Sequence, residues 1–206
     1  MKSKNFRKYL TTDTISIPNL QTTINRYSWS QTARIDLDRE TKWLNTWNHS
    51  FLPIDIRDFG LKHLNNTIKY NVHKSKINSL ISPSCTFCEL KKMLPAQRET
   101  IKHIYIECPT TYSFANNYFN NNLRVLNFNF SQANLLIGAP SYLPDFVIFI
   151  LNIEILMLNF FLYNCARKKK IPLMCNFVCF IANYRKLFLQ NGSYSKRFSR
   201  IIFDPG

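Results

Sequence analysis

The apolar run from Phe146 to Tyr163 restricts the possible folds of this chain more than any other feature. Its sequence, FVIFILNIEILMLNFFLY, is long enough to cross a bilayer, and four basic residues follow at 167–170. Glu154 stands near its middle, however, and a charged side chain at the centre of a bilayer costs about 2.5–3.5 kcal/mol on insertion scales. Asn152 and Asn159 add to that cost. The run is therefore predicted to be a buried core helix.

Composition indicates a folded chain with a polyanionic partner. The 206 residues are 46% hydrophobic and 15% aromatic, which is enough to form the core of one domain or of two small ones. Lys and Arg number 27 against 12 Asp and Glu, giving a formal charge of +15. Such an imbalance is most often found in proteins that bind nucleic acid. The alternative is a basic, solvated surface without a partner.

The N-terminus and the cysteines point to an intracellular protein. The first ten residues, MKSKNFRKYL, contain no apolar stretch of the kind that marks a secretory signal peptide. We therefore expect a nuclear or cytoplasmic location, not secretion. In such a reducing compartment, the six cysteines are better explained as thiols and metal ligands than as disulfides.

The hydrophobic pattern predicts a mainly α fold made of small helical domain(s) around a CCHC zinc-binding module. Residues 1–50 are expected to form an arm and an amphipathic helix over 29–47, and residues 51–120 a basic helical segment with the zinc-binding module. Within 54–81, one helix face is expected to be buried and the other positive. Residues 121–206 form the C-terminal helical region, in which Pro144 begins the apolar helix and Pro172 separates it from a last helix over 174–189.

The candidate metal ligands are Cys85, Cys88, His103 and Cys108, in the pattern C-x2-C-x14-H-x4-C. A C-x2-C turn lets two thiolates bind one ion, and a downstream pair can complete a tetrahedron. His103 lies in a predicted short helix that must end before Pro109, so that the chain can return Cys108 to the ion. A thiolate-rich set that fills all four positions favours structural zinc and leaves no place for an activated water.

A catalytic zinc site and a chance cluster are the alternatives to structural zinc. A zinc deaminase requires a Glu two residues after the His and a downstream P-C-x-x-C, but Tyr105 occupies the place of that Glu. A chance grouping of core cysteines remains the alternative to any metal site.

The stretches CTFC and RETIKHIYIECP resemble the zinc-binding segment near the C-terminus of reverse transcriptases from LINE-type (non-LTR) retrotransposons. In that family, C-x2-C is followed by E-T-x-x-H and, after four more residues, by C-P. The resemblance extends from about Ile54 onward, through DFGLKHLNNTIKYNVHKSKI, LLIGAP and RKKKIP. It implies a zinc-binding, nucleic-acid-binding module with RNA as the favoured ligand, and the remainder of a reverse transcriptase or a ribonucleoprotein as a further partner.

The catalytic residues of that family are missing from this sequence. Its polymerase domain needs a Tyr/Phe-x-Asp-Asp motif, and no Asp-Asp pair occurs here. Some relatives carry a nuclease with Pro-Asp followed by Glu-x-Lys. Pro144 and Asp145 match its beginning, but Glu154 is followed by Ile155 and Leu156. We therefore predict a non-catalytic protein.

The candidate nucleic-acid contacts are basic residues in three groups, namely Lys62, Lys69, Lys74, Lys76, Lys91, Lys92, Arg98, Lys102, Arg167, Lys168, Lys169 and Lys170. The last four also suit a helix C-terminus, where positive charge is favourable without any partner. Neighbouring aromatic residues in 105–119 are expected mostly to pack the zinc module rather than to stack on bases. His63 and His73 are expected at the surface, and Cys165, Cys175 and Cys179 as buried thiols without a metal.

Two further functions are compatible with the sequence. In the first, the chain is an inactive, transposon-derived remnant. In the second, it is a structural or interaction subunit of a larger ribonucleoprotein or membrane assembly. Direct membrane association is not expected.

Overall fold

The computed structural model describes residues 42–43, 45–46, 52–64, 67–122 and 130–190. These form the helices α4 (Ile54–Leu64), α5 (Asn71–Ile77), α6 (Thr86–Leu90), α7 (Pro109–Asn122), α8 (Asn134–Ile137), α9 (Asp145–Arg167) and α10 (Met174–Gln190), with the π-helix η2 (His103–Glu107) before α7. No strand occurs within these ranges, where Ser84 and Arg98 form an isolated antiparallel bridge. The predicted mainly α fold is confirmed.

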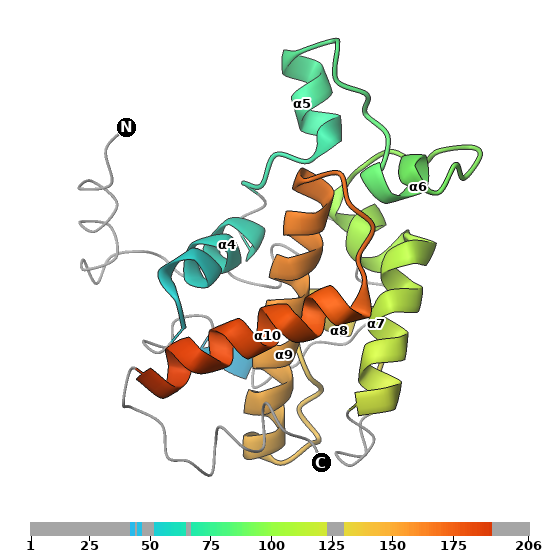
Figure 1. Cartoon of the computed structure of the whole chain (residues 1–206). Helices are drawn as coiled ribbons and strands as arrows, with labels where there is room; N and C mark the ends of the chain where they lie inside the picture. The colour runs from blue at the N-terminus through green and yellow to red at the C-terminus, as the bar shows by residue number, and fades with distance from the viewer. Residues whose placement is uncertain (1–41, 44, 47–51, 65–66, 123–129, 191–206) are drawn as a thin grey trace, which may run out of the picture.

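The apolar helix α9 is the centre of the fold, with α4, α8 and α10 packed against it (Figure 1). It begins after Pro144, as predicted, because proline fits the start of a helix, and it ends at Arg167, two residues before Lys169, where φ is positive. Among the described residues, α9 is the one helix long and apolar enough to cross a membrane, yet 78% of its most apolar window is buried within the protein. This burial agrees with the predicted core helix.

The polar residues of α9 bind other parts of the protein. Asn152 Oδ1 accepts a hydrogen bond from the backbone N–H of Ala139 at 2.8 Å, and Asn159 Nδ2 donates to the carbonyl of Leu135. Glu154 accepts a hydrogen bond from the hydroxyl of Tyr118 on α7. Because buried polar groups are stable only with such partners, these side chains fix the positions of α7 and α8 against α9.

Aromatic rings join α7, α9 and α10. Phe161 contacts both Phe114 and Phe177, with ring centroids 5.9 and 5.0 Å away, and these two rings also contact each other. The predicted last helix is confirmed as α10, and Figure 1 shows it crossing α9. Tyr184 of α10 also donates a hydrogen bond to Asp55 of α4 at 2.8 Å. This bond connects α10 with α4.

The prediction of one buried face over 54–81 holds for α4 and is wrong for α5. In α4, Ile56 and Phe59 are buried, whereas α5 buries none of its residues and leaves Ile77 73% exposed. The two helices are separate because the chain is extended around Ile68 and Tyr70, which are buried in place of α5. In Figure 1, α5 lies at the edge of the molecule.

His63 is buried, so its expected surface position is wrong. It follows Phe59 by one helical turn on the buried face of α4, and its ring centroid lies 4.9 Å from that of Tyr105, edge to face. Burial lowers the pKa of His63 to about 3, because an imidazolium loses its hydration there.

Most of the helix predicted over 29–47 lies outside the described residues. Residues 42–43 and 45–46 are helical. Trp43 is fully buried and donates a hydrogen bond from Nε1 to the carbonyl of Leu136 at 3.2 Å.

Candidate metal centre

The first ligand pair is set by a tight connection around α6. Cys85 is the residue before α6 and Cys88 lies in its first turn, so both side chains project from the same short segment. The backbone N–H of Cys85 donates to the carbonyl of Gln97 at 2.7 Å, next to the Ser84–Arg98 bridge. This antiparallel contact brings the chain after residue 97, and with it the second ligand pair, back toward the first.

The second ligand pair is placed by η2. Thr100 Oγ1 accepts a hydrogen bond from the N–H of His103 at 3.0 Å, and the N–H of Cys108 donates to the carbonyl of His103 at 2.7 Å, closing a π-type turn. Cys108 itself is extended, with φ −71° and ψ 117°, as the following proline requires. The predicted end of this helix at Pro109 is confirmed, and it directs Cys108 toward the ion site.

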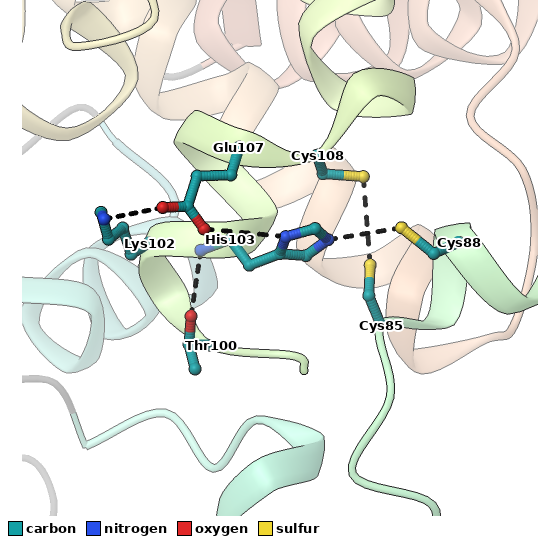
Figure 2. A network of polar contacts seen from close by, with 7 residues as sticks. All are labelled: Cys85, Cys88, Thr100, Lys102, His103, Glu107 and Cys108. Atoms are coloured by element: carbon teal, nitrogen blue, oxygen red, sulfur yellow. Dashed lines mark hydrogen bonds and ion pairs between the residues drawn. The ribbon is translucent and has the colours of Figure 1, made fainter. Parts of the chain in front are cut away.

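The four predicted ligands converge on one point (Figure 2). Cys85 Sγ lies 3.9 Å from Cys108 Sγ, Cys88 Sγ lies 3.3 Å from His103 Nε2, and all four ligand atoms are within 4.8 Å of one another. A zinc tetrahedron with Zn–S near 2.3 Å and Zn–N near 2.0 Å has edges of about 3.5–3.8 Å. The arrangement can therefore hold a metal ion such as zinc. The sulfur separation is far longer than a disulfide bond.

The three cysteines of the site differ in pKa. All four side chains are buried. The thiol of Cys85 donates a hydrogen bond to Cys108, which lowers the pKa of Cys108 and raises that of Cys85. Burial raises the pKa of Cys88. Thiolate is the form of cysteine that binds metals. A divalent cation at this site would therefore displace the remaining thiol protons.

Two charged residues lie next to His103. Its Nε2 faces the sulfurs, while Nδ1 lies 3.9 Å from Glu107 Oε2 on the other side of the ring (Figure 2). Glu107 is held in turn by Lys102 at 2.7 Å. A carboxylate commonly lies behind a metal-binding histidine, but the 3.9 Å separation here is longer than a hydrogen bond. Neither Glu107 nor Thr100 was predicted to support the site, although the spacing T-x-x-H is typical of a helix cap.

A second carboxylate, that of Glu99, joins the two halves of the site and is 3% exposed. Its Oε2 accepts hydrogen bonds from the N–H and the hydroxyl of Thr86, at 2.9 and 2.7 Å. Thr86 follows Cys85 directly, so this contact lies beside the ligands. The sequence places Glu99 in the E-T-x-x-H motif but does not indicate this role.

The predicted nucleic-acid contacts are spread over three places. Lys69, Lys76, Lys91, Lys92 and Arg98 are exposed on α5 and on the connections beside it, and Lys74 is half-buried. The group 167–170 is exposed at the C-terminal end of α9, which Figure 1 shows on the same side of the molecule as α5 and α6.

Two of the predicted contacts are in ion pairs. Lys62 pairs with Asp58, and Lys102 pairs with Glu107. Both lysines are also exposed, so neither pairing buries the charge.

The remaining cysteines are placed differently from the prediction. Cys175 and Cys179 are exposed and Cys165 is half-buried, so the expectation of buried thiols is wrong. The side of α10 that carries Phe177, Phe180 and Ile181 faces the core, which leaves the two cysteines on the opposite side. In the part of the chain that the structure describes, no metal-binding group besides Cys85, Cys88, His103 and Cys108 was found.

The aromatic residues after His103 are mostly buried, as predicted, but Phe114 and Tyr118 of α7 pack against Phe161 of α9 and Phe177 of α10 and not within the zinc module. Tyr105, Phe114, Tyr118 and Phe119 are buried, and Tyr112 is 45% exposed. Four of the five are therefore unavailable for stacking on bases.

Comparisons with protein-family models, with curated proteins and with solved structures found no match to this chain. The metal centre is consequently interpreted from its own geometry.

Proposed function

We propose that this chain is a non-catalytic, zinc-binding module that binds nucleic acid. The observation that carries the proposal is the convergence of three buried sulfurs and one imidazole beside a surface rich in lysine. The metal is proposed to hold the residues from 85 to 108 in place, and the lysines around them to contact phosphates.

Zinc is the metal that this ligand set supports best. Thiolates and imidazole are soft or borderline ligands, whereas magnesium and calcium prefer oxygen. Three sulfurs and one nitrogen complete a tetrahedron, so a bound zinc ion has no open position for water or substrate. A structural role, without chemistry at the metal, follows from that closed ligand set.

The polyanionic ligand is supported by the charge of the chain. A formal charge of +15 attracts a polyanion, and exposed lysines that displace counterions make the affinity depend steeply on salt. RNA is favoured over DNA only because CTFC and RETIKHIYIECP resemble the zinc-binding segment of LINE-type reverse transcriptases. On the same resemblance, the remainder of a reverse transcriptase or a ribonucleoprotein is the proposed larger partner, inside the cell.

The zinc proposal is tested by metal analysis of the purified protein and of two serine variants. Wild type and Cys175→Ser are expected to hold one zinc per chain, because Cys175 is exposed and far from the ligand set in the sequence. Cys85→Ser is expected to lose the ion and the protection of residues 85–108 from proteolysis. A full zinc content in Cys85→Ser would refute the assigned ligands.

The nucleic-acid proposal is tested by titrating labelled single-stranded RNA and duplex DNA at about 50 and about 200 mM salt. If six or more phosphates are neutralised, affinity should fall by about a thousandfold between these concentrations. Weak binding that does not change with salt would refute the proposed electrostatic contact, whatever the metal content.

An interaction subunit is the second candidate function, and exposed apolar side chains favour it. Leu80 and Leu94 are 92% and 93% exposed, and both belong to connections of the zinc module. Large aliphatic side chains in such positions are typical of contacts with another protein. If Leu94→Ser leaves RNA binding unchanged but abolishes capture of a partner, this second function is supported.

A further inference from the structure

The basic helix α5 lacks the apolar contacts that normally hold a helix in place. It has seven residues, none of them buried. A helix of this length is not stable alone, because the nucleation cost exceeds what a few hydrogen bonds return. The buried Tyr70 anchors the chain just before α5, but a single anchor does not set the direction of the helix.

The missing support comes from the carboxylate of Glu99. Its Oε1 accepts a hydrogen bond from the N–H of Asn71, the first residue of α5, at 3.0 Å. Its Oε2 accepts two hydrogen bonds from Thr86 beside the metal ligands, at 2.9 and 2.7 Å. One buried carboxylate therefore holds the start of α5 and the start of α6 together.

Asn71 strengthens the same junction from the other side. Its Nδ2 donates to the carbonyl of Ser84 at 3.0 Å and lies 3.2 Å from Thr86 Oγ1. The backbone carbonyl of Glu99 also accepts from the N–H of Val72 at 3.4 Å. Three chain segments, 71–72, 84–86 and residue 99, thus meet in one network of hydrogen bonds.

This network lies directly next to the metal ligands in the sequence. Thr86 stands between Cys85 and Cys88, and Glu99 precedes Thr100, whose hydroxyl caps the N–H of His103. An ion that fixes Cys85, Cys88 and His103 therefore also fixes Thr86 and the backbone at Glu99. Without the ion, the two halves are joined by these hydrogen bonds and by the backbone pairing of residues 83–85 with residues 97–99.

We propose that Glu99 couples metal binding to the position of α5, so that the lysines of this helix are presented to a polyanion only when the ion is bound. This inference rests on the proposed function for its ligand, but its structural part does not. Glu99 is a positioning residue, because its carboxylate is buried and unable to contact phosphate. Lys74 and Lys76 are the lysines of α5 whose positions depend on it.

A purely electrostatic role for Glu99 predicts a different result. The two roles differ in the direction of the change in RNA affinity that Glu99→Gln causes. Glu99→Gln removes a negative charge near a polyanion-binding surface, so electrostatics alone would increase RNA affinity. If Glu99 positions α5, the same substitution decreases RNA affinity, since the amide offers a donor where two N–H groups and a hydroxyl need acceptors.

The structural part is tested without RNA, by amide hydrogen exchange of residues 71–77 in the whole chain. In wild type, adding one equivalent of Zn²⁺ is expected to slow exchange in α5 by at least about tenfold, the effect of retaining a hydrogen bond to a charged group. In zinc-loaded Glu99→Gln, α5 is expected to exchange as fast as in the metal-free wild type. If zinc still protects α5 in Glu99→Gln, the coupling through Glu99 is refuted.

The matched control is Glu89→Gln. Glu89 is an exposed carboxylate on α6 whose Oε1 accepts a hydrogen bond from Ser82, so the substitution removes the same charge from the same module without touching Asn71 or Thr86. RNA affinity of Glu89→Gln is expected to equal or exceed that of wild type, while that of Glu99→Gln falls at least about fivefold below it. Equal or higher affinity in both variants would overturn the proposal.

A second variant covers the case in which Glu99→Gln no longer folds. Thr86→Val removes the hydroxyl that donates to Glu99 Oε2 and accepts from Asn71 Nδ2, but it keeps the N–H bond to Glu99, so it weakens the junction without abolishing it. It is expected to keep its zinc and to lose part of the α5 protection. Full protection would refute the role of this junction. If the hydrogen-exchange results are as expected but neither wild type nor any variant binds RNA, the proposed ligand is wrong and the coupling through Glu99 still stands.

Discussion

The buried carboxylate of Glu154 should make the stability of this protein decrease as the pH rises. Glu154 is fully buried in the middle of α9 and accepts a hydrogen bond from Tyr118. Burial removes the hydration of the ionised form and raises the pKa of Glu154 from 4.5 to about 7, although the hydrogen bond from Tyr118 opposes this shift.

The sign and size of the effect follow from proton linkage. Between these two pKa values, the folded state binds a proton at Glu154 that the unfolded state has lost, so the contribution of Glu154 to stability is greatest below pH 4.5 and is lost as the pH rises through 7. At about 1.36 kcal/mol per pKa unit, the full loss is about 3 kcal/mol. Glu154→Gln keeps an acceptor for Tyr118 and cannot ionise, so it should escape this loss.

Urea unfolding of zinc-saturated wild type and Glu154→Gln at about pH 5 and about pH 8 measures the effect. The difference in unfolding free energy between the two proteins should shift in favour of Glu154→Gln by about 2–3 kcal/mol over this range. All remaining titrating groups, including the metal ligands, are common to both proteins and cancel in that difference. A difference that does not change with pH would refute the assignment of a raised pKa to Glu154.

Three further predictions concern other buried positions. Because the pKa of His63 is lowered to about 3, wild type should lose stability as the pH falls below 6.5, and His63→Gln should remove that loss. Urea unfolding on both sides of pH 6.5 tests this prediction. Equal pH dependence in both proteins would contradict it. Gly138→Ala should destabilise the fold by about 2 kcal/mol or more in thermal unfolding, because φ is 74° and a Cβ would lie 2.6 Å from Asn152 Oδ1 and 2.7 Å from Trp43. An unchanged Tm would show that the surrounding side chains move to accommodate the added methyl group. Thr100→Ala removes the cap on His103 and should weaken zinc binding about fivefold in a chelator competition, whereas the exposed Thr67→Ala should not change it.

The metal centre was predictable because its geometry is local. The spacing of Cys85 and Cys88 defines one turn, and Pro109 determines where the segment carrying His103 must end. The pairing of Ser84 with Arg98, which brings these two halves together, has no comparable signal in the sequence. Spacing therefore identified four residues that converge, and the structure supplied the contact that joins them.

The main helices were also predictable, since Pro144 and Pro172 mark the starts of α9 and α10. The errors arose where an apolar pattern was ambiguous. The apolar pattern of α4 was extended to Val72 and Ile77 of α5, but these are five residues apart and are not buried, and hydrogen bonds to Glu99 hold α5 instead. For His63, the neighbouring lysine suggested an exposed position, although its spacing of four from Phe59 indicates the buried face.

The exposed cysteines of α10 could have been placed correctly from the sequence. Cys175 and Cys179 are one turn apart on the side opposite Phe177 and Ile181. Once the aromatic stripe is assigned to the core, the other side must face solvent.

The order of α9 and α10 along the chain matters during synthesis. The whole of α9 leaves the ribosome before Phe177, which packs on Phe161 and closes one side of the core. For that interval, a helix with the length and apolarity of a membrane anchor has no α10 surface to cover it. Cells that make this protein must therefore keep nascent α9 away from membrane insertion and aggregation until its last helix arrives.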